Sequence, residues 1–189
     1  MVPRRKLWTR EEVAFFESHE AFAGKHYELI EGELLDRMGK KPPHLYVLRQ
    51  LVLALGDLFG ARRILHEANV EVAIADRPTS LPEPDVVALT QNFDAFLGRY
   101  VEPHEIALVV EVSDTSLAFD LRTKARLYAR AAIAEYWVVD INARCVIVHR
   151  EPVEGCYESV VSFGSGERIA PLAALDRTFA VDDAFPPHS

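Results

Sequence analysis

The sequence predicts a mixed α/β or α+β protein in which helices flank a β-sheet. The main observation is the order of three segments: a strand at 106–112, a helix at about 116–131 and a strand at 135–141. Two strands joined by a crossover helix pair in parallel, because a tight turn cannot connect parallel neighbours. Shorter alternating segments on either side of this unit indicate antiparallel hairpins, so we expect a sheet of mixed direction.

The chain is predicted to begin with a helix and a hairpin. Thr9 and Glu12 have the spacing of a capping box, in which each side chain bonds the backbone of the other residue, so we expect a helix from about 10 to 20. Residues 26–35 then alternate partly between polar and apolar, and Gly32 suits a turn between two short strands. This segment is therefore expected to start a hairpin.

A long helix and two strands are expected next. Apolar residues recur at helical spacing after Pro42 and Pro43, which predicts a helix over residues 44–59. Residues 70–75 place apolar side chains at alternating positions, as a half-buried strand does, and residues 84–89 form a second strand. The apolar positions that define the helix are Leu45, Leu48, Leu51, Val52, Leu55 and Leu58.

The strand at 106–112 is almost continuously apolar, which is typical of a strand buried on both faces of a sheet. Three polar residues after it can cap the helix at 116–131. The strand at 135–141 is followed by a turn at 142–144 and a hairpin, and the chain ends with a short helix or a segment that caps the sheet. The cap candidates are Ser113, Asp114 and Thr115, the hairpin strands lie at 146–148 and 157–163, and the final apolar residues are Leu172, Leu175 and Phe179.

Composition narrows the classes of protein that this chain can be. Of its 189 residues 49% are hydrophobic and 26% are charged, which excludes a disordered, collagen-like or low-complexity chain. The chain has no internal repeat and no linker-like run, so we expect a single domain over residues 1–189. The net charge of −8 argues against a protein that coats nucleic acid. It leaves open an enzyme that meets nucleic acid through a local basic patch and a metal ion.

The expected location follows from features that the sequence lacks. Cys145 and Cys156 are too few for a disulfide framework and lack metal-ligand spacing, so we expect two small hydrophobic residues in a reducing compartment. No apolar run approaches the roughly 18 residues that span a membrane. The basic residues at 4–6 are not followed by the apolar segment of a secretory signal. We therefore expect a cytoplasmic protein with no membrane partner.

Glu111 is the most informative single residue, because it lies inside the most apolar strand. A buried carboxylate is costly unless it is paired, hydrogen-bonded or bound to a metal ion. Glu111 could simply reach a sheet edge or a neighbouring arginine, and Asp85, which follows Pro84 at a strand start, could be ordinary turn chemistry. As a pair, however, two carboxylates at adjacent strand ends are what a hard cation such as Mg²⁺ needs, with water completing its coordination.

Asp120, Lys124 and Tyr128 are spaced four apart and share one face of the predicted crossover helix. In isolation, Asp120 and Lys124 could be a surface ion pair worth a few tenths of a kcal/mol. Together with Glu111, the same face could direct Lys124 at a metal site. An ammonium group there can orient or help to activate the attacking water, and it can offset charge on a phosphate oxygen.

Other charged residues are candidates for a supporting role. His44 opens the long helix, where a histidine is commonly a cap or a surface residue. Glu31 and Glu33 flank the turn glycine and are expected to be turn carboxylates, although they could also join the acidic pair. No Gly-rich phosphate loop, nucleophile elbow, zinc spacing or Ser/His/Asp arrangement is visible. The basic residues that either face solvent or contact phosphate are the stripe Arg122, Arg126 and Arg130 and the pair Arg62 and Arg63.

Several stretches of the chain resemble the Uma-type restriction-endonuclease-like proteins, a family of the PD-(D/E)xK nuclease superfamily. The resemblance extends from about residue 9 to residue 165, and its last stretch is quite specific, whereas a Pro-Asp pair alone is not. The matching stretches are 27–34, His44 at the head of its helix, 84–86, 110–116, the set Asp120, Lys124 and Tyr128, and 135–140.

The resemblance implies a restriction-endonuclease-like core with the element order αβββαβ and a phosphodiesterase site that depends on Mg²⁺ or Mn²⁺. Asp85 matches the first acid and Glu111 the second, and these two residues are the implied metal ligands, together with the Val112 carbonyl. The superfamily pattern has lysine two residues after the second acid, where this chain has Ser113. In proteins similar to this one, the lysine role moves to the following helix, where Lys124 stands.

The resemblance therefore implies a metal-dependent nuclease whose partner is nucleic acid, and we expect DNA. Glu31, His44 and Asp120 are additional candidates for its site. An endonuclease that cuts both strands often needs two sites, so we expect a homodimer. The alternative is a binding or scaffold module that keeps the fold and has lost the activity. The net charge and the displaced lysine favour this module slightly, whereas the intact set of Asp85, Glu111 and Lys124 favours the enzyme. Hydrolysis of a small phosphoester is a third interpretation.

Overall fold

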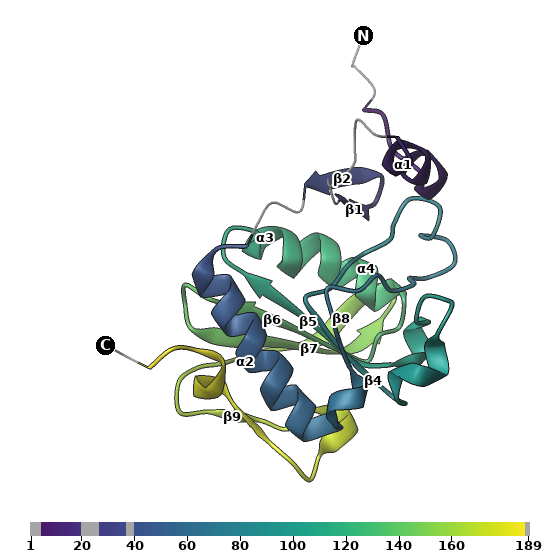
Figure 1. Ribbon diagram of the computed structural model, residues 1–189. Helices are drawn as coiled ribbons and strands as arrows, with labels where there is room; N and C mark the ends of the chain where they lie inside the picture. The colour runs from purple at the N-terminus through teal and green to yellow at the C-terminus, as the bar shows by residue number, and fades with distance from the viewer. Residues whose placement is uncertain (1–4, 20–26, 37–39, 188–189) are drawn as a thin grey trace.

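A six-stranded mixed β-sheet forms the centre of the computed structural model, which describes residues 5–19, 27–36 and 40–187 (Figure 1). Its strand order is β3-β4-β5-β6-β7-β8, with β5 and β6 parallel and the other neighbouring pairs antiparallel. The predicted parallel crossover is thus confirmed. The strands are β3 (Ile64–His66), β4 (Val86–Leu89), β5 (Ile106–Ser113), β6 (Glu135–Asp140), β7 (Cys145–Val153) and β8 (Cys156–Phe163).

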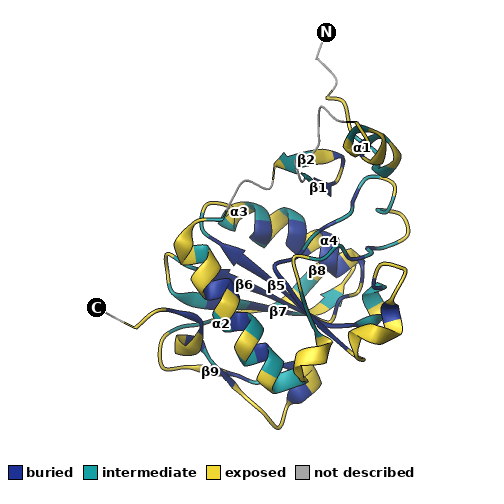
Figure 2. Ribbon diagram, viewed as in Figure 1, coloured by how far each residue is buried: buried dark blue, intermediate teal, exposed yellow. Residues whose placement is uncertain are grey.

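Helices cover both faces of this sheet, because its central strands carry apolar side chains on both sides. Every residue of β4, β5 and β6 is buried. One alternating set, which includes Val86 and Val110, packs against the helix α2 (Pro42–Phe59). The other set, which includes Val87 and Val109, packs against the crossover helices. Figure 2 shows the buried strands between helices whose outer faces are exposed.

The helix α2 begins at Pro42, two residues before its predicted start. Two prolines fit the first turn of a helix, because the N–H groups there have no partner within the helix. The helix ends before Gly60, whose φ of 94° favours glycine. Its first turn carries His44, which lies next to Asp85 just before the start of β4.

The crossover between β5 and β6 is helical, as predicted, but it is not one regular α-helix. It consists of α3 (Leu117–Phe119), a π-helical turn at Asp120–Lys124 and α4 (Ala125–Arg130). Such π turns are frequent at functional sites. This turn places the buried side chains of Asp120 and Lys124 against the end of β5.

The N-terminal helix and hairpin lie close to their predicted positions. The helix α1 (Arg10–Glu17) has the complete capping box between Thr9 and Glu12. The strands β1 (Tyr27–Ile30) and β2 (Glu33–Asp36) pair antiparallel, and both residues of the turn between them have positive φ. The predicted boundaries at residues 20 and 26 fall outside the described residues.

One predicted strand is wrong, and one strand of the six-stranded sheet, β3, is absent from the prediction. Residues 70–75 form no strand beyond a single bridge between Val70 and Val101. Their alternation reflects burial instead: Val70 and Val72 are buried, whereas Ile74 is exposed. The segment therefore crosses a hydrophobic surface without a partner strand along its length. The strand β3 has three residues, too few to show an alternating pattern.

The C-terminal segment caps the face of the sheet that α2 covers. Ile169, Phe179 and Phe185 belong to the same buried cluster as the apolar residues of α2. The segment contains the paired strands β9 (Arg168–Ile169) and β10 (Phe179–Ala180) and 3₁₀ turns at Leu172–Ala174 and Val181–Ala184. Other 3₁₀ turns lie at Ala61–Arg63, Phe93–Phe96 and Pro103–Glu105.

The element order α2, β3, β4, β5, crossover helices and β6 reproduces the αβββαβ core that the family resemblance implies. Cys145 is half-buried, Cys156 is exposed, and neither forms a disulfide. Cys156 therefore does not pack as a hydrophobic residue. None of the helices in the described ranges has both the length and the apolar character needed to cross a membrane.

Candidate functional site

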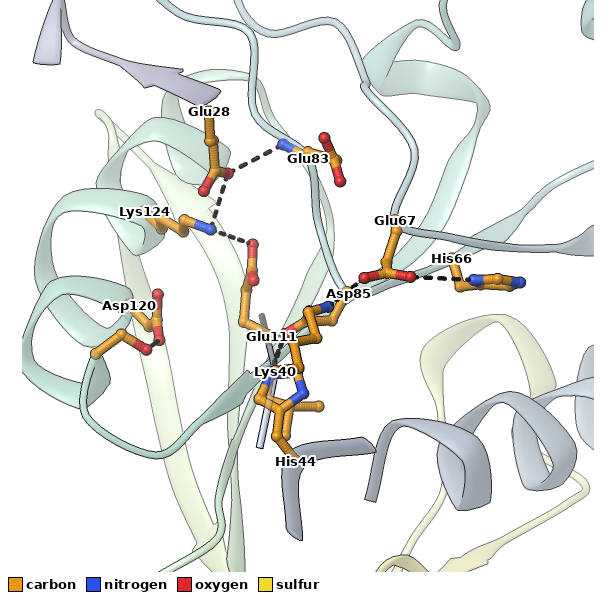
Figure 3. A network of polar contacts seen from close by, with 12 residues as sticks. Glu28, Lys40, His44, His66, Glu67, Glu83, Asp85, Glu111, Asp120 and Lys124 are labelled. Carbon is orange, nitrogen blue, oxygen red and sulfur yellow. Dashed lines mark hydrogen bonds and ion pairs between the residues drawn. The ribbon is translucent and has the colours of Figure 1, made fainter. Parts of the chain in front are cut away.

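Asp85 and Glu111 occupy the next pair of positions in the register of β4 and β5. Val86 lies opposite Val110, so continuing the antiparallel register by one residue sets Asp85 opposite Glu111. The Asp85 Oδ2 atom accepts a hydrogen bond of 2.7 Å from the backbone N–H of Val112, which fixes this carboxylate against β5. Both residues are buried, with exposures of 2% and 3%. Asp85 and Glu111 thus lie on neighbouring strands at one end of the sheet (Figure 3).

Glu111 is held by two donors from the crossover helix. Its Oε1 atom accepts hydrogen bonds of 2.9 Å from Lys124 Nζ and of 2.9 Å from the Tyr128 hydroxyl. Burial raises the pKa of Glu111 to about 8; the charge of Lys124 opposes this rise, and the charge of Asp85 adds to it. Without a further cation, Glu111 therefore resists ionisation at neutral pH.

Lys124 joins two carboxylates. Its Nζ atom lies 2.9 Å from Glu111 Oε1 and 2.9 Å from Glu28 Oε1. Glu28 is buried in β1 and also accepts a hydrogen bond of 3.0 Å from the backbone N–H of Glu83. Burial alone lowers the pKa of Lys124, but the neighbouring carboxylates, first Glu111 and then Glu28, raise it by more. Lys124 therefore stays protonated at neutral pH and cannot serve as a general base.

Asp85 is surrounded by basic side chains at the start of α2. Lys40 Nζ lies 2.5 Å from Asp85 Oδ1, and His44 Nε2 lies 3.5 Å from Asp85 Oδ2. Lys40 also pairs with Glu67 at 2.8 Å. Burial raises the pKa of Asp85, but the hydrogen bond from His44 and the charge of Lys40 lower it to well below its ordinary value. Asp85 is thus ionised at neutral pH, in contrast to Glu111.

Asp120 lies beside this cluster and is held separately from it. Its Oδ2 atom accepts hydrogen bonds of 2.6 Å from each of the Ser113 and Ser116 hydroxyls. Burial raises the pKa of Asp120. The interpretation of Asp120 and Lys124 as a surface ion pair is wrong, because both residues are buried and Lys124 pairs with other carboxylates. Ser113, which stands where the superfamily pattern has lysine, supports Asp120 instead.

Glu31 is not part of the cluster. It lies in the β1–β2 turn with a φ of 49° and pairs with Arg130 at 2.7 Å. Glu33, on the other side of the turn glycine, pairs with Arg5 at 3.3 Å. Both glutamates, Glu31 in the turn and Glu33 at the start of β2, are therefore exposed residues that pair with surface arginines, and the structure brings neither of them to Asp85 or Glu111.

Sequence reasoning missed Glu28 and Lys40. Glu28 stands between Tyr27 and Leu29 in a predicted strand, so the signal that singled out Glu111, a carboxylate among apolar strand residues, was present for it. Lys40 lies before the prolines of α2 and has no comparable signal. Its contact with Asp85 spans 45 residues of sequence and depends on how α2 meets the sheet.

Asp85 and Glu111 are the residues that could hold a metal ion. Carboxylate oxygens suit Mg²⁺ or Mn²⁺, and Mg²⁺ typically uses one or two protein carboxylates and keeps several waters. Within the described ranges, no three His, Cys, Asp or Glu side chains are grouped so as to hold a metal ion. This donor set therefore fits a hydrated hard cation and does not fit a structural zinc site. Lys40 and Lys124 now supply the positive charge beside the two carboxylates.

Comparisons with known proteins extend this description. A crystal structure described as "a putative nuclease belonging to DUF820 from Anabaena variabilis ATCC 29413" is similar to this chain, with a TM-score of 0.67 and 15% sequence identity over 94% of this chain and 97% of that one. At this identity the likeness concerns the fold alone. A comparison with curated proteins found no match. The family model of Uma2, described as "Putative restriction endonuclease", matches residues 13–182. Because that match covers most of the chain, the protein belongs to the Uma2 family, as its sequence motifs predict.

Proposed function

We propose that this protein is a metal-dependent endonuclease that hydrolyses phosphodiester bonds of DNA. The observation that carries the proposal is the meeting of Asp85 and Glu111 at one end of the sheet, with the buried ammonium group of Lys124 on Glu111. Membership of the Uma2 family supports the endonuclease class. The enzyme acts as a homodimer, because cutting both strands of a duplex takes two sites.

Each side chain of the cluster has a distinct role in this proposal. Asp85, already ionised, and Glu111, which gives up its proton, hold Mg²⁺ or Mn²⁺. A cation bound there supplies Lewis acidity and lowers the pKa of a bound water. Lys124 donates to the attacking water and offsets charge on the phosphate. Glu28 positions Lys124 through their ion pair of 2.9 Å.

His44 and Lys40 set the charge around Asp85. His44 keeps the Asp85 carboxylate oriented through its Nε2 atom, while its Nδ1 atom is buried and has no hydrogen-bond partner among the residues described. In the proposed enzyme this imidazole contacts a phosphate oxygen or the leaving group. Lys40 supplies a positive charge to Asp85 whenever the metal ion is absent.

The second candidate function is a non-catalytic binding or scaffold module. Burial of the cluster favours it, because Asp85, Glu111 and Lys124 are each at most 4% exposed and pair with one another or with neighbours. A network of this kind also stabilises a fold without any substrate. A module of this kind has no reason to bind Mn²⁺ at Asp85 and Glu111, so metal binding separates the two functions.

The test combines cleavage with metal binding. Purified protein is incubated with plasmid DNA, single-stranded DNA and RNA, with Mn²⁺ or Mg²⁺ and with EDTA, and Mn²⁺ binding is measured by calorimetry. We expect metal-dependent cleavage of DNA that Glu111→Gln abolishes. Glu33→Gln is the matched control, because it makes the same chemical change at the exposed first residue of β2. A wild-type protein that neither binds Mn²⁺ nor cleaves any substrate contradicts the proposal and favours the binding module.

A further inference from the structure

A groove lies between the crossover helix and the β7–β8 hairpin, on the same side of the sheet as Glu111. It encloses about 370 Å³. It belongs to neither the carboxylate cluster nor the loops around it. Its lining includes Arg122 and Arg126 from the helical segment, His149 from β7, and Cys156, Tyr157 and Val160 from β8.

Two arginines of this groove have no partner within the described part of the chain. Arg122 and Arg126 are exposed, and neither makes a hydrogen bond or an ion pair there. Arg130, the third residue of the same stripe, is held by Asp76 at 2.8 Å and by Glu31 at 2.7 Å. In a chain with a net charge of −8, two guanidinium groups without counter-charges form a local positive site. Their spacing of four residues directs both to one flank of the helix.

The floor of the groove is aromatic and holds a polar atom that is not satisfied. His149 is 3% exposed, and its Nδ1 atom has no hydrogen-bond partner among the described residues. Its ring lies 5.2 Å from that of Tyr136 and 5.7 Å from that of Tyr157. Burial lowers the pKa of His149, so the imidazole is neutral at pH 7. Buried polar atoms are almost always paired, so this nitrogen lacks the partner that a buried imidazole ordinarily has.

The groove and the carboxylate cluster lie on two flanks of one helical segment. Lys124 and Tyr128 donate to Glu111 on one flank, and the two arginines line the groove on the other. The ring of Tyr136 lies between these flanks, 5.0 Å from Tyr128 and 5.2 Å from His149. One helical segment therefore separates the groove from the carboxylate cluster.

We propose that this groove binds a nucleotide of a DNA strand that flanks the cleaved phosphate. The inference rests on the proposed nuclease function and names a subsite of it. Guanidinium groups bind phosphate oxygens through paired, charge-assisted hydrogen bonds, so Arg122 and Arg126 take the phosphate. The sugar and base lie against Tyr157 and Val160, since aromatic side chains bind bases of any sequence by stacking.

Cys156 provides a direct readout of this groove. Its thiol is free, exposed and part of the lining, so a bound strand should slow its alkylation by a neutral reagent such as iodoacetamide. Cys145 is free, half-buried and not part of the lining, and therefore serves as an internal control that peptide mass spectrometry resolves. The probe is a short oligothymidylate, in EDTA so that no cleavage occurs.

The test compares two double variants. The groove variant is Arg122→Gln/Arg126→Gln, and the control variant is Arg49→Gln/Arg63→Gln. The control removes the same charge at two exposed arginines that lie outside the groove and also have no partner among the described residues. We expect the strand to slow Cys156 alkylation several-fold in the wild type and in the control, and not in the groove variant. The affinity of the protein for the oligothymidylate is also measured at several salt concentrations. The slope of log affinity against log salt concentration should be smaller in magnitude by about 1.4 in the groove variant than in the wild type, the value for two phosphate contacts on a single strand.

Four outcomes are decisive. Equal protection of Cys156 in the groove variant overturns the inference, and so does equal protection by inorganic phosphate at matched ionic strength. Cleavage by the wild type without any protection of Cys156 overturns the groove and leaves the nuclease function standing. Arginine-dependent protection by a protein that never cleaves supports the groove and contradicts the nuclease function.

Discussion

The Asp85 carboxylate and the backbone N–H of Val112 lie 2.7 Å apart, in a hydrogen bond that joins the end of β4 to β5. Because Val112 directly follows Glu111, backbone geometry sets the position of the first carboxylate relative to the second. Preorganised ligands lose little conformational entropy when they bind. Asp85 is therefore the fixed member of the pair, and Glu111, which must give up a proton and share its Lys124 contact, is the adjustable one.

Replacing Asp85 tests this pair. Asp85→Asn keeps the shape of the side chain and an acceptor for the Val112 N–H, but it removes the charge that holds a cation. We expect Mn²⁺ binding to fall below detection by calorimetry and cleavage to be lost, with an unchanged circular dichroism spectrum. Asp94→Asn, at an exposed aspartate that pairs with Arg62, should change neither property. Wild-type Mn²⁺ affinity in an Asp85→Asn/Glu111→Gln protein would show that the metal binds elsewhere.

Lys124→Met should be costly to stability as well as to activity. The change removes the ammonium group that pairs with the buried Glu28 carboxylate and donates to the buried Glu111 carboxyl group, and breaking a buried pair on one side costs about 3–5 kcal/mol. Urea denaturation measures this loss, and adding Glu28→Gln to Lys124→Met should recover part of it. Cleavage should be lost while Mn²⁺ binding remains. A loss of at most about 0.5 kcal/mol together with full activity is the behaviour of a surface lysine and would remove Lys124 from the site.

A sharper control for this prediction uses Ser113. This residue lies two positions after Glu111, where the superfamily pattern has lysine, and its hydroxyl donates to Asp120. Ser113→Lys in the Lys124→Met background would place an ammonium group at the same end of β5. Recovery of cleavage would assign both positions to one catalytic locus. Without recovery, the idea that the lysine has moved to the helix loses its support.

Glu111→Gln should change how the stability of the metal-free protein depends on pH. Burial raises the pKa of Glu111 from 4.5 to about 8 in the folded chain. The stabilising contribution of this group is therefore complete below pH 4.5 and is lost as the pH rises through about 8, by on the order of 1 kcal/mol per pH unit. Wild type should thus lose stability relative to Glu111→Gln between about pH 5 and about pH 8.

Lys124 and Asp85 do not titrate within this pH window, and Asp120, whose pKa burial also raises, is present in both proteins. The pKa of Lys124 is raised above its ordinary 10.5, so its contribution is lost only at higher pH. The pKa of Asp85 is lowered below its ordinary 3.8, so its contribution is lost only as the pH falls below that value. Urea denaturation in EDTA at both ends of the window measures the effect. Parallel stability profiles of wild type and Glu111→Gln would mean that Glu111 ionises normally.

Lys40→Met should strengthen metal binding. The Lys40 ammonium group lies 2.5 Å from Asp85, so a metal ion must compete with it for the same carboxylate. Removing the competitor should raise Mn²⁺ affinity several-fold in a calorimetric titration. Lys41→Met is the matched control, because Lys41 is exposed and pairs only loosely, at 3.6 Å, with Asp114. Weaker Mn²⁺ binding in Lys40→Met would indicate that Lys40 assists the metal site.

Local patterns made the central part of this fold predictable. The apolar run at 106–112 and the crossover that follows it carry their own signals, and a parallel pair is the arrangement that such a connection allows. The meeting of Asp85 and Glu111 could be predicted because each stands at a strand with a recognisable pattern. Lys124 could be linked to them because its helix follows directly from the Glu111 strand.

Features that depend on long-range packing were not predictable in this way. The contact of Lys40 with Asp85 and that of Glu28 with Lys124 join segments that no periodic pattern relates. The segment 70–75 alternates because of burial alone, which the sequence does not distinguish from pairing with a neighbouring strand. A spacing of four residues predicts that side chains share one face of a helix, but it does not show whether that face is buried or exposed.

The number of residues in the π turn at Asp120–Lys124 determines whether this cluster can form. Such a turn is equivalent to an α-helix with one inserted residue. Deleting Thr123, which is only half-buried, would restore a regular helix and rotate the residues after it by about 100° relative to Asp120. Asp120 could then keep its two serine donors only if Lys124 turned away from Glu111. A relative that has the same acidic residues and the same lysine, but one residue fewer in this turn, could not place both Asp120 and Lys124 in these contacts.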